Sequence, residues 1–152
     1  MLSKLINESR TQTVNQVQNW QEAIRVASKP LLKQNCIEES YIDKMIDAVN
    51  QHGPYIILAD RFALPHASNT GEVNELSMSL LRLENDVDFL GQPVSTFMVL
   101  ATIDSNSHLE ALTALAELLY DEENLNTFTT KSTDEILSLI RGHEQQRKEE
   151  DS

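Results

Sequence analysis

His66 is the residue whose setting best suits chemistry. It follows a short apolar segment at 62–64 and then Pro65, whose ring fixes φ and removes the amide hydrogen. An imidazole titrates near neutral pH and has two distinct nitrogens, so it can act as a nucleophile. A stiff mount lowers the entropic cost of aligning that nitrogen with a reacting atom. The simpler alternative is a loop histidine that is hydrogen-bonded to a neighbouring carbonyl.

A second histidine, His108, follows an apolar, β-rich segment at 94–102. The run 107–110, Ser-His-Leu-Glu, is typical of a capping box, which places His108 in the first turn of a helix. Free amide hydrogens and the positive end of the helix dipole collect in that turn and favour anions. Sites in open α/β sheets gather beyond strand ends, so the two histidines could converge there.

The spacing of hydrophobic residues predicts helices and strands that alternate irregularly along the chain, with no internal sequence repeat. Asn19 and Glu22 form a capping box for the first helix, and Pro30 predicts a kink or a restart within it. The predicted helices are 19–31, 38–50, 107–119, 124–129 and 132–140, and the predicted strands are 11–17, 55–59, 62–64, 76–80 and 94–102. We expect the 76–80 strand to have one wet or partly covered face and the 94–102 strand to be buried on both. This order favours an α/β fold in which helices cover both faces of a mixed sheet.

The length, net charge and cysteine count of the chain argue against several classes of function. The 152 residues suffice for one domain, and the net charge of −12 argues against nucleic acid and against an anionic membrane surface as partners. That charge is compatible with a partner carrying a basic docking patch. The single cysteine, Cys36, excludes an internal disulfide and fits a reducing cytoplasm. No apolar stretch is long enough to span a bilayer, so we expect a soluble, cytoplasmic protein without membrane insertion.

The segment 53–57, Gly-Pro-Tyr-Ile-Ile, followed by 63–67, Ala-Leu-Pro-His-Ala, resembles the active-site signature of the mannitol/fructose type of enzyme IIA (EIIA type 2) of the bacterial sugar phosphotransferase system. The Leu-Pro-His-Ala end is most similar to the ascorbate-specific branch. The segment 104–112 resembles the second signature of the same family. The resemblance covers nearly the whole chain. It implies a three-layer α/β/α sandwich with a mixed central sheet over residues 1–142, followed by a polar tail, 143–152, that we expect to be disordered.

The resemblance also implies roles for individual residues. His66 matches the phosphorylated histidine, and His108 matches the histidine that hydrogen-bonds the phosphoryl group. Arg61 is the nearest guanidinium in sequence and could help, or it could be a surface charge paired with Asp60. The implied partners are the histidine phosphocarrier protein HPr, an enzyme IIB component and, indirectly, the membrane enzyme IIC. No cofactor or metal is implied, and the oligomeric state stays open.

Three classes of function are compatible with these residues. The first is a phosphocarrier for uptake of ascorbate or a related sugar, with Phe62 and Leu64 either in a docking patch or in the core. The second is a regulatory enzyme IIA-like module that binds partners according to its phosphorylation state. The third is a metal hydrolase built from His66, His108, Asp60 and Asp104, which no tight ligand spacing supports.

Overall fold

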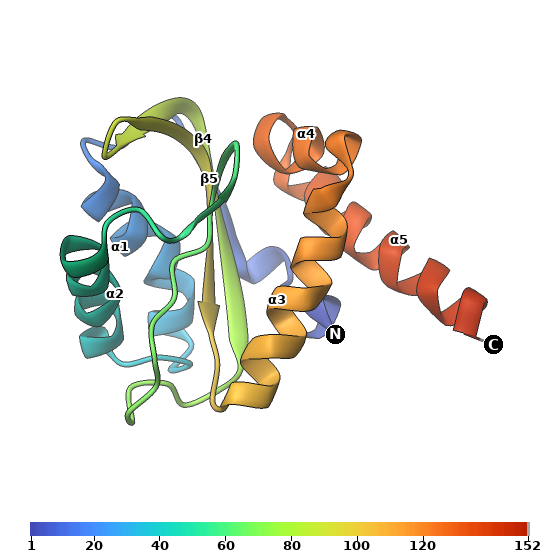
Figure 1. Ribbon diagram of the computed structural model, residues 1–152, viewed down its shortest axis with the longest axis horizontal. Coiled ribbons are helices and arrows are strands. Elements are labelled where there is room, and N and C mark those ends of the chain that lie inside the picture. The colour runs from blue at the N-terminus through green and yellow to red at the C-terminus, as the bar shows by residue number, and fades with distance from the viewer. Residues whose placement is uncertain (152) are drawn as a thin grey trace.

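A five-stranded mixed sheet forms the middle layer of the protein (Figure 1). The computed structural model describes residues 1–151. The strands are β1 (Thr11–Val14), β2 (Ile57–Ala59), β3 (Arg61–Ala63), β4 (Ser77–Phe89) and β5 (Gln92–Ala101), in the spatial order β1-β4-β5-β3-β2. β1 pairs parallel with β4, and β3 pairs parallel with β5. The pairs β4–β5 and β2–β3 are antiparallel, so the prediction of a mixed sheet is confirmed.

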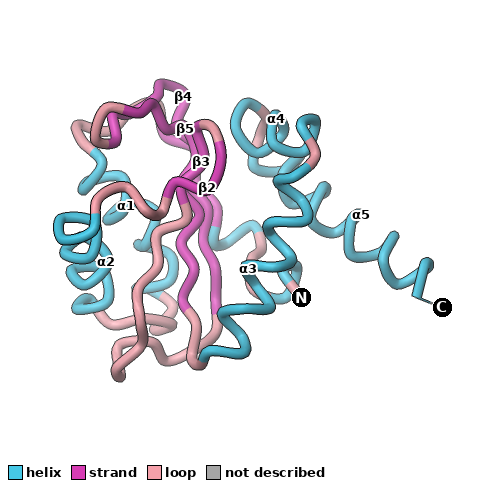
Figure 2. The backbone as a smooth tube through the Cα atoms, viewed as in Figure 1, coloured by secondary structure: helices cyan, strands magenta, loops and turns pink. Residues whose placement is uncertain are grey.

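Helices cover both faces of this sheet (Figures 1 and 2). Helices α1 (Trp20–Lys33) and α2 (Glu39–His52) lie on one face, and α3 (Ser105–Tyr120), α4 (Glu122–Thr130) and α5 (Thr133–Asp151) lie on the other. Two short 3₁₀ helices, η1 (Leu2–Lys4) and η2 (Glu8–Arg10), precede β1. The predicted three-layer α/β/α sandwich is therefore confirmed.

The central strand β5 supplies both hydrophobic cores. Phe97, Val99 and Ala101 pack toward α1 and α2, whereas Met98 and Leu100 pack toward α3, α4 and α5. This alternation follows from the two-residue period of a strand. Because both faces are covered, β5 is apolar throughout its second half, as the sequence predicts.

Helix α1 passes through Pro30 as one helix, so of the two predicted outcomes, a kink or a restart, the restart is absent. Pro30 has no amide hydrogen, so it cannot donate to the carbonyl of Val26 four residues earlier. The side-chain amide of Gln12, on β1, donates to that carbonyl at 2.7 Å instead. The lost helical bond is thus replaced from the neighbouring strand. Half of the predicted capping box at the start of α1 is present, since the side chain of Asn19 accepts from the amide of Glu22 at 2.8 Å. The Glu22 carboxylate accepts from the amide of Gln18 at 2.6 Å and not from that of Asn19.

Strand β4 differs from the prediction in length and in burial. It runs on to Phe89, well beyond the predicted 76–80 segment, and the face that was expected to be wet or partly covered is closed, since Ser77 and Ser79 are fully buried. The Ser79 hydroxyl donates to the Ala27 carbonyl on α1 at 2.6 Å, which satisfies its buried oxygen. A serine that bonds a helix carbonyl belongs to the core, although its residue type suggests solvent.

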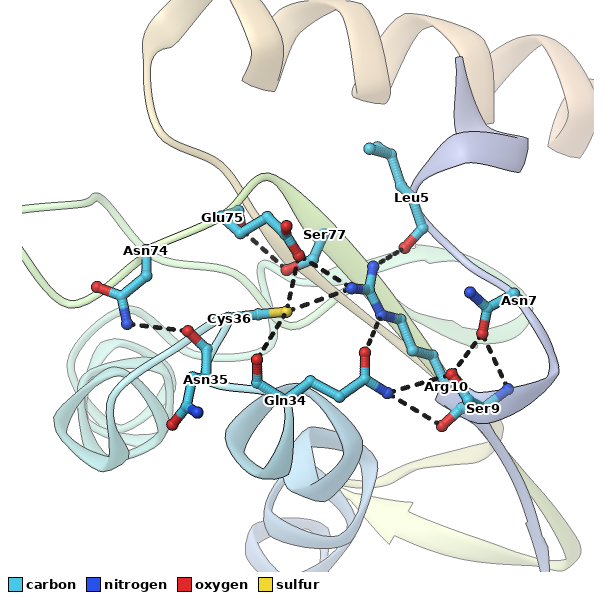
Figure 3. Close-up of polar contacts among 10 residues, drawn as sticks. All are labelled: Leu5, Asn7, Ser9, Arg10, Gln34, Asn35, Cys36, Asn74, Glu75 and Ser77. Atoms are coloured by element: carbon cyan, nitrogen blue, oxygen red, sulfur yellow. Dashed lines mark hydrogen bonds and ion pairs between the residues drawn. The ribbon is translucent and has the colours of Figure 1, made fainter.

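Arg10 ties three segments together at the edge of this core (Figure 3). Its guanidinium donates to the Leu5 carbonyl at 2.7 Å, to the Gln34 side chain at 2.9 Å and to the Glu75 carboxylate at 3.0 Å. The thiol of Cys36 donates to the same carboxylate at 3.1 Å. Burial raises the pKa of this thiol, and the Glu75 bond raises it further, so Cys36 is a protonated core residue.

Helix α5 continues to Asp151, through most of the segment 143–152 for which the sequence predicts a polar tail. Its polar residues are mostly Glu, Gln, Lys and Arg, which have high helix propensity. Arg147 lies 2.5 Å from the Glu117 carboxylate on α3, and His143 lies 3.7 Å from it. A polar composition predicts an exposed segment here and does not by itself exclude a helix.

Candidate functional site

The parallel pairing of β3 with β5 brings the two histidines together. Parallel strands end at the same edge of a sheet, so the loops that leave β3 and β5 meet there. His66 lies in the first of these loops, and α3, which carries His108, begins after the second. The centroids of the two imidazole rings are 5.3 Å apart, with an angle of 47° between their planes.

Hydrogen bonding determines which nitrogen of His66 is free. Its Nδ1 lies 2.6 Å from the Leu64 carbonyl oxygen. A carbonyl can only accept, so the proton of the neutral ring is on Nδ1 and the lone pair is on Nε2. Leu64 is itself held, because its amide donates to the Ile56 carbonyl at 2.8 Å and its side chain is fully buried.

The same environment keeps His66 neutral. Burial lowers the pKa of His66 below its usual value of 6.5; the bond to the Leu64 carbonyl opposes this shift, and the nearby His108 adds to it. An imidazole with a lowered pKa is unprotonated at neutral pH and can attack an electrophile. The geometry therefore presents Nε2 as a nucleophile.

A cavity of about 530 Å³ opens between the two loops and the start of α3. It is lined by His66, Ala67, Ser68, Asn69, Thr102, Ile103, Asp104, Ser105 and His108, with no lysine or arginine among them. A second cavity of about 710 Å³, on the α2 side, shares His66, Ala67 and Ser68. His66 is thus accessible from two directions.

Ser68 lines both cavities together with His66, whereas Thr70, two residues further along the loop, lines neither. Thr70 is engaged elsewhere. Its amide and hydroxyl donate to the Glu72 carboxylate at 2.8 and 2.6 Å, and its hydroxyl accepts from Lys44 at 2.9 Å. The two hydrogen bonds that Thr70 donates to the Glu72 carboxylate are the main reason why the pKa of Glu72 is lowered to about 2.

Helix α3 is capped three residues earlier than predicted, at Asp104 instead of Ser107. The capping box is formed by Asp104 and Ser107, and the Asp104 carboxylate accepts from the Ser107 amide at 2.8 Å. This bond and the Ser107 side chain lower the pKa of Asp104. The His108 amide donates to the Asp104 carbonyl at 3.1 Å, so it is already part of the helix. His108 therefore contributes its ring to the cavity, and its backbone N–H is not free to bind an anion.

Arg61 does not reach the site, and of the two alternatives for Phe62 and Leu64, a docking patch or the core, the structure has the core. Arg61 begins β3, the end of the strand farthest from His66, and pairs with Asp86 at 3.4 Å instead of Asp60. Its register partner, Val94, lies near the start of β5, whereas the cavity follows the end of β5. Phe62 and Leu64 are fully buried, so they belong to the core and not to a docking patch.

Two tyrosines contribute to the site without having been singled out from sequence. Tyr55, expected to begin the predicted strand 55–59, precedes β2 and is 40% exposed. Its hydroxyl donates to the His66 carbonyl at 2.8 Å. Tyr41, on α2, accepts a hydrogen bond from the Ala67 amide at 3.0 Å. The Gly-Pro-Tyr part of the active-site signature could have indicated a role for Tyr55. Nothing in the sequence distinguishes Tyr41 from an ordinary core residue of its helix.

A metal centre has no support in the described part of the chain. Among residues 1–151, no three histidine, cysteine, aspartate or glutamate side chains are placed to share a metal ion. Asp60 occupies the turn between β2 and β3, away from the cavity that His66, His108 and Asp104 line. Within the same residues, every helix is too short or too polar to cross a bilayer.

Comparison with known proteins identifies the class to which this fold and site belong. The family model described as "Phosphoenolpyruvate-dependent sugar phosphotransferase system, EIIA 2" matches residues 4–143. The chain belongs to this family of phosphotransferase components.

Two proteins from Escherichia coli strain K12 are similar to this chain over most of its length. The "Mannitol-specific cryptic phosphotransferase enzyme IIA component" is 38% identical over 141 residues, covering 91% of this chain and 96% of the relative. The "Ascorbate-specific PTS system EIIA component" is 30% identical over 130 residues, covering 82% and 84%. Both branches are thus represented, and identity is higher to the mannitol-specific cryptic relative.

Solved structures agree with this assignment. The solution structure of the mannitol-specific cryptic enzyme IIA from Escherichia coli superposes with a TM-score of 0.84 at 37% identity, covering 91% of this chain and 97% of that one. Enzyme IIAMTL of Escherichia coli, solved in complex with phosphorylated enzyme IIBMTL, superposes with a TM-score of 0.75 at 22% identity, covering 90% and 97%. The second similarity concerns the fold.

Proposed function

We propose that this protein is a cytoplasmic phosphocarrier that accepts a phosphoryl group from HPr on Nε2 of His66 and passes it to an enzyme IIB component. The observation that carries the proposal is the bond of 2.6 Å between His66 Nδ1 and the Leu64 carbonyl, which leaves the Nε2 lone pair free. Membership of the EIIA 2 family supports the same role.

Transfer of the phosphoryl group from HPr to His66 requires no proton transfer at His66. The Nε2 lone pair of His66 attacks phosphorus in line and forms an N–P bond. The bond between phosphorus and the histidine of HPr breaks, and its electron pair goes to that nitrogen. Throughout the step, Nδ1 of His66 keeps its proton and its bond to Leu64. The reverse sequence then transfers the group to a cysteine or histidine of enzyme IIB.

His108 is the group best placed to stabilise the transferred charge. Its ring centroid is 5.3 Å from that of His66, which puts a ring N–H within reach of a phosphoryl oxygen. A hydrogen bond to a charged oxygen is shorter and stronger than a neutral one. No lysine or arginine lines the cavity, so its side-chain N–H donors besides His66 are the His108 ring and the Asn69 amide, and the His108 ring is the one in contact with His66.

The proposed partners follow from the family. The enzyme IIAMTL of Escherichia coli, which has the same fold, forms a complex with phosphorylated enzyme IIBMTL, and this supports an enzyme IIB as the acceptor here. The membrane enzyme IIC takes part indirectly, through enzyme IIB. For the transported sugar we propose ascorbate or a related compound, and the mannitol-specific cryptic relative makes mannitol the competing candidate.

The test is incubation with phosphoenolpyruvate, enzyme I and HPr, followed by mapping of the acid-labile phosphate. We expect the label on His66 and its loss in His66→Ala, whereas His143→Ala, altered on α5 away from the cavity, keeps it. Adding ascorbate-type or mannitol-type enzyme IIB should then discharge the label. Stable labelling with no discharge to either would favour the regulatory module, and absence of label on His66 would refute both readings.

A further inference from the structure

The peptide group that joins His66 to Ala67 is bound at both ends by tyrosine hydroxyls. On the oxygen side, the Tyr55 hydroxyl donates to the His66 carbonyl at 2.8 Å. On the nitrogen side, the Ala67 amide donates to the Tyr41 hydroxyl at 3.0 Å. One planar unit, directly after the nucleophile, is therefore held from two directions.

Each tyrosine is anchored outside the loop that it holds. Tyr41 belongs to the first turn of α2 and is fully buried; its hydroxyl also donates to the Leu100 carbonyl on β5 at 2.9 Å, the shorter of its two carbonyl contacts. Tyr55 follows Gly53, whose φ of +79° ends α2 and turns the chain back toward the site. Helix α2 thus supplies both contacts, one from its start and one from just beyond its end.

Tyr55 also contacts the imidazole itself. The centroids of the Tyr55 and His66 rings are 5.5 Å apart, and their planes meet at 79°, which is an edge-to-face arrangement. The Tyr55 ring lines the cavity on the α2 side, whereas His108 lines the cavity on the α3 side. The imidazole of His66 lies between these two rings.

We propose that Tyr55 and Tyr41 are positioning residues that fix His66 for phosphoryl transfer before a partner docks. This inference rests on the proposed function, in which Nε2 of His66 is the phosphoryl acceptor. The bond between Nδ1 and the Leu64 carbonyl requires a particular backbone geometry over 64–66. Pro65 fixes the backbone before His66, and its carbonyl accepts from the Leu100 amide at 3.0 Å. The two tyrosines fix the backbone after His66.

Fixing the backbone on both sides of His66 keeps Nε2 aligned for attack on phosphorus. In-line attack on phosphorus requires Nε2 to point along one direction, and small misplacements of a reacting atom cost rate. A loop held on only one side could rotate its peptide plane and tilt the imidazole with it. Holding the plane at both ends keeps the acceptor oriented in the free protein, so docking of HPr need not order it.

The test uses Tyr55→Phe, which keeps the ring and removes the hydroxyl. The matched control is Tyr120→Phe, since Tyr120 is 93% exposed at the end of α3. In single-turnover labelling from phosphorylated HPr, we expect Tyr55→Phe to lower the rate constant at saturating HPr by about fivefold, the loss typical of one net hydrogen bond. The HPr concentration for half-maximal rate should be unchanged, and Tyr120→Phe should match the unsubstituted protein.

A second readout needs no phosphoryl donor. The ¹⁵N shifts of the His66 ring report how much of the Nδ1–H form is present, and we expect Tyr55→Phe to reduce it. In Tyr41→Phe, exchange of the Ala67 amide hydrogen should be at least tenfold faster, because its acceptor is gone. The fraction of folded protein is measured in parallel by circular dichroism.

The outcomes separate the two proposals. An unchanged rate constant and unchanged ring shifts in Tyr55→Phe would overturn the positioning role. So would a slower rate that is fully accounted for by a smaller folded fraction. If the unsubstituted protein takes no label on His66 but Tyr55→Phe alters the ring shifts, positioning of the ring stands and the phosphocarrier function fails.

Discussion

Replacing His108 measures how much of the transfer rate depends on the second imidazole. With the ring centroids 5.3 Å apart, a full positive charge on His108 would interact with a phosphoryl charge by about 3 kcal/mol at an effective dielectric constant near 20. A neutral N–H donating to a charged oxygen contributes about 1.5–3 kcal/mol. Both estimates correspond to a rate loss of roughly 10- to 150-fold in His108→Ala.

The assay is rapid-quench transfer from phosphorylated HPr, followed by discharge to enzyme IIB. We expect His108→Ala to be labelled slowly on His66, and His108→Gln to recover part of the rate because its amide can donate. His143→Ala is the control, because it removes an imidazole that lies 3.7 Å from Glu117 and lines neither cavity beside His66. A rate for His108→Ala within about twofold of the unsubstituted protein would refute the reasoning. Complete loss of label would also refute it, because His108 would then be indispensable and not merely stabilising.

Two further predictions concern protonation and packing. Because burial and His108 lower the pKa of His66, the labelling rate should rise with pH and level off below the usual imidazole value of 6.5; a midpoint above that value would contradict the geometry. The same shift makes the folded state lose stability as pH falls below 6.5, since the unfolded chain then binds the proton more readily. Phe62→Ala should lower the free energy of unfolding by about 3–5 kcal/mol in urea titrations, because Phe62 is fully buried against Phe128 with ring centroids 5.6 Å apart. Leu58→Ala, at a side chain that is 42% exposed, should cost much less, and equal losses for the two would argue against a buried Phe62.

The parts of the site that depend on local chemistry were predictable from sequence. Pro65 predicts a stiff exit from the strand before His66, and the apolar 94–102 segment predicts the strand that leads to His108. The Asn19 cap was likewise readable from its own four residues. In each case the structure is determined by neighbours in the chain.

Other features depend on contacts that no local pattern contains. The sequence 104–110 contains two possible capping boxes, one at 104–107 and one at 107–110. The structure forms the earlier one, so Asp104 is the cap of α3. Ser77 and Ser79 look like solvent-facing residues from their types, but both are fully buried, and Ser79 is hydrogen-bonded to the Ala27 carbonyl on α1. Arg61 is close to His66 in sequence, but an extended strand carries it to the opposite end of the sheet. Helix α5 extends past the predicted boundary at 140, and the ion pair between Arg147 and Glu117, which joins these added turns to α3, is a contact that no local pattern contains.

The contact between His66 and Leu64 has a consequence for how relatives of this protein can diverge. The nitrogen that stays free on His66 is selected within a stretch of three residues, whereas the lining of the cavity beside it includes Ser68, Asn69 and Ile103. Under the phosphocarrier function proposed above, we expect substitutions in that lining to change which carrier or acceptor protein is preferred while the nucleophile stays intact. Selection can alter recognition and chemistry separately, and one scaffold can serve different sugar pathways.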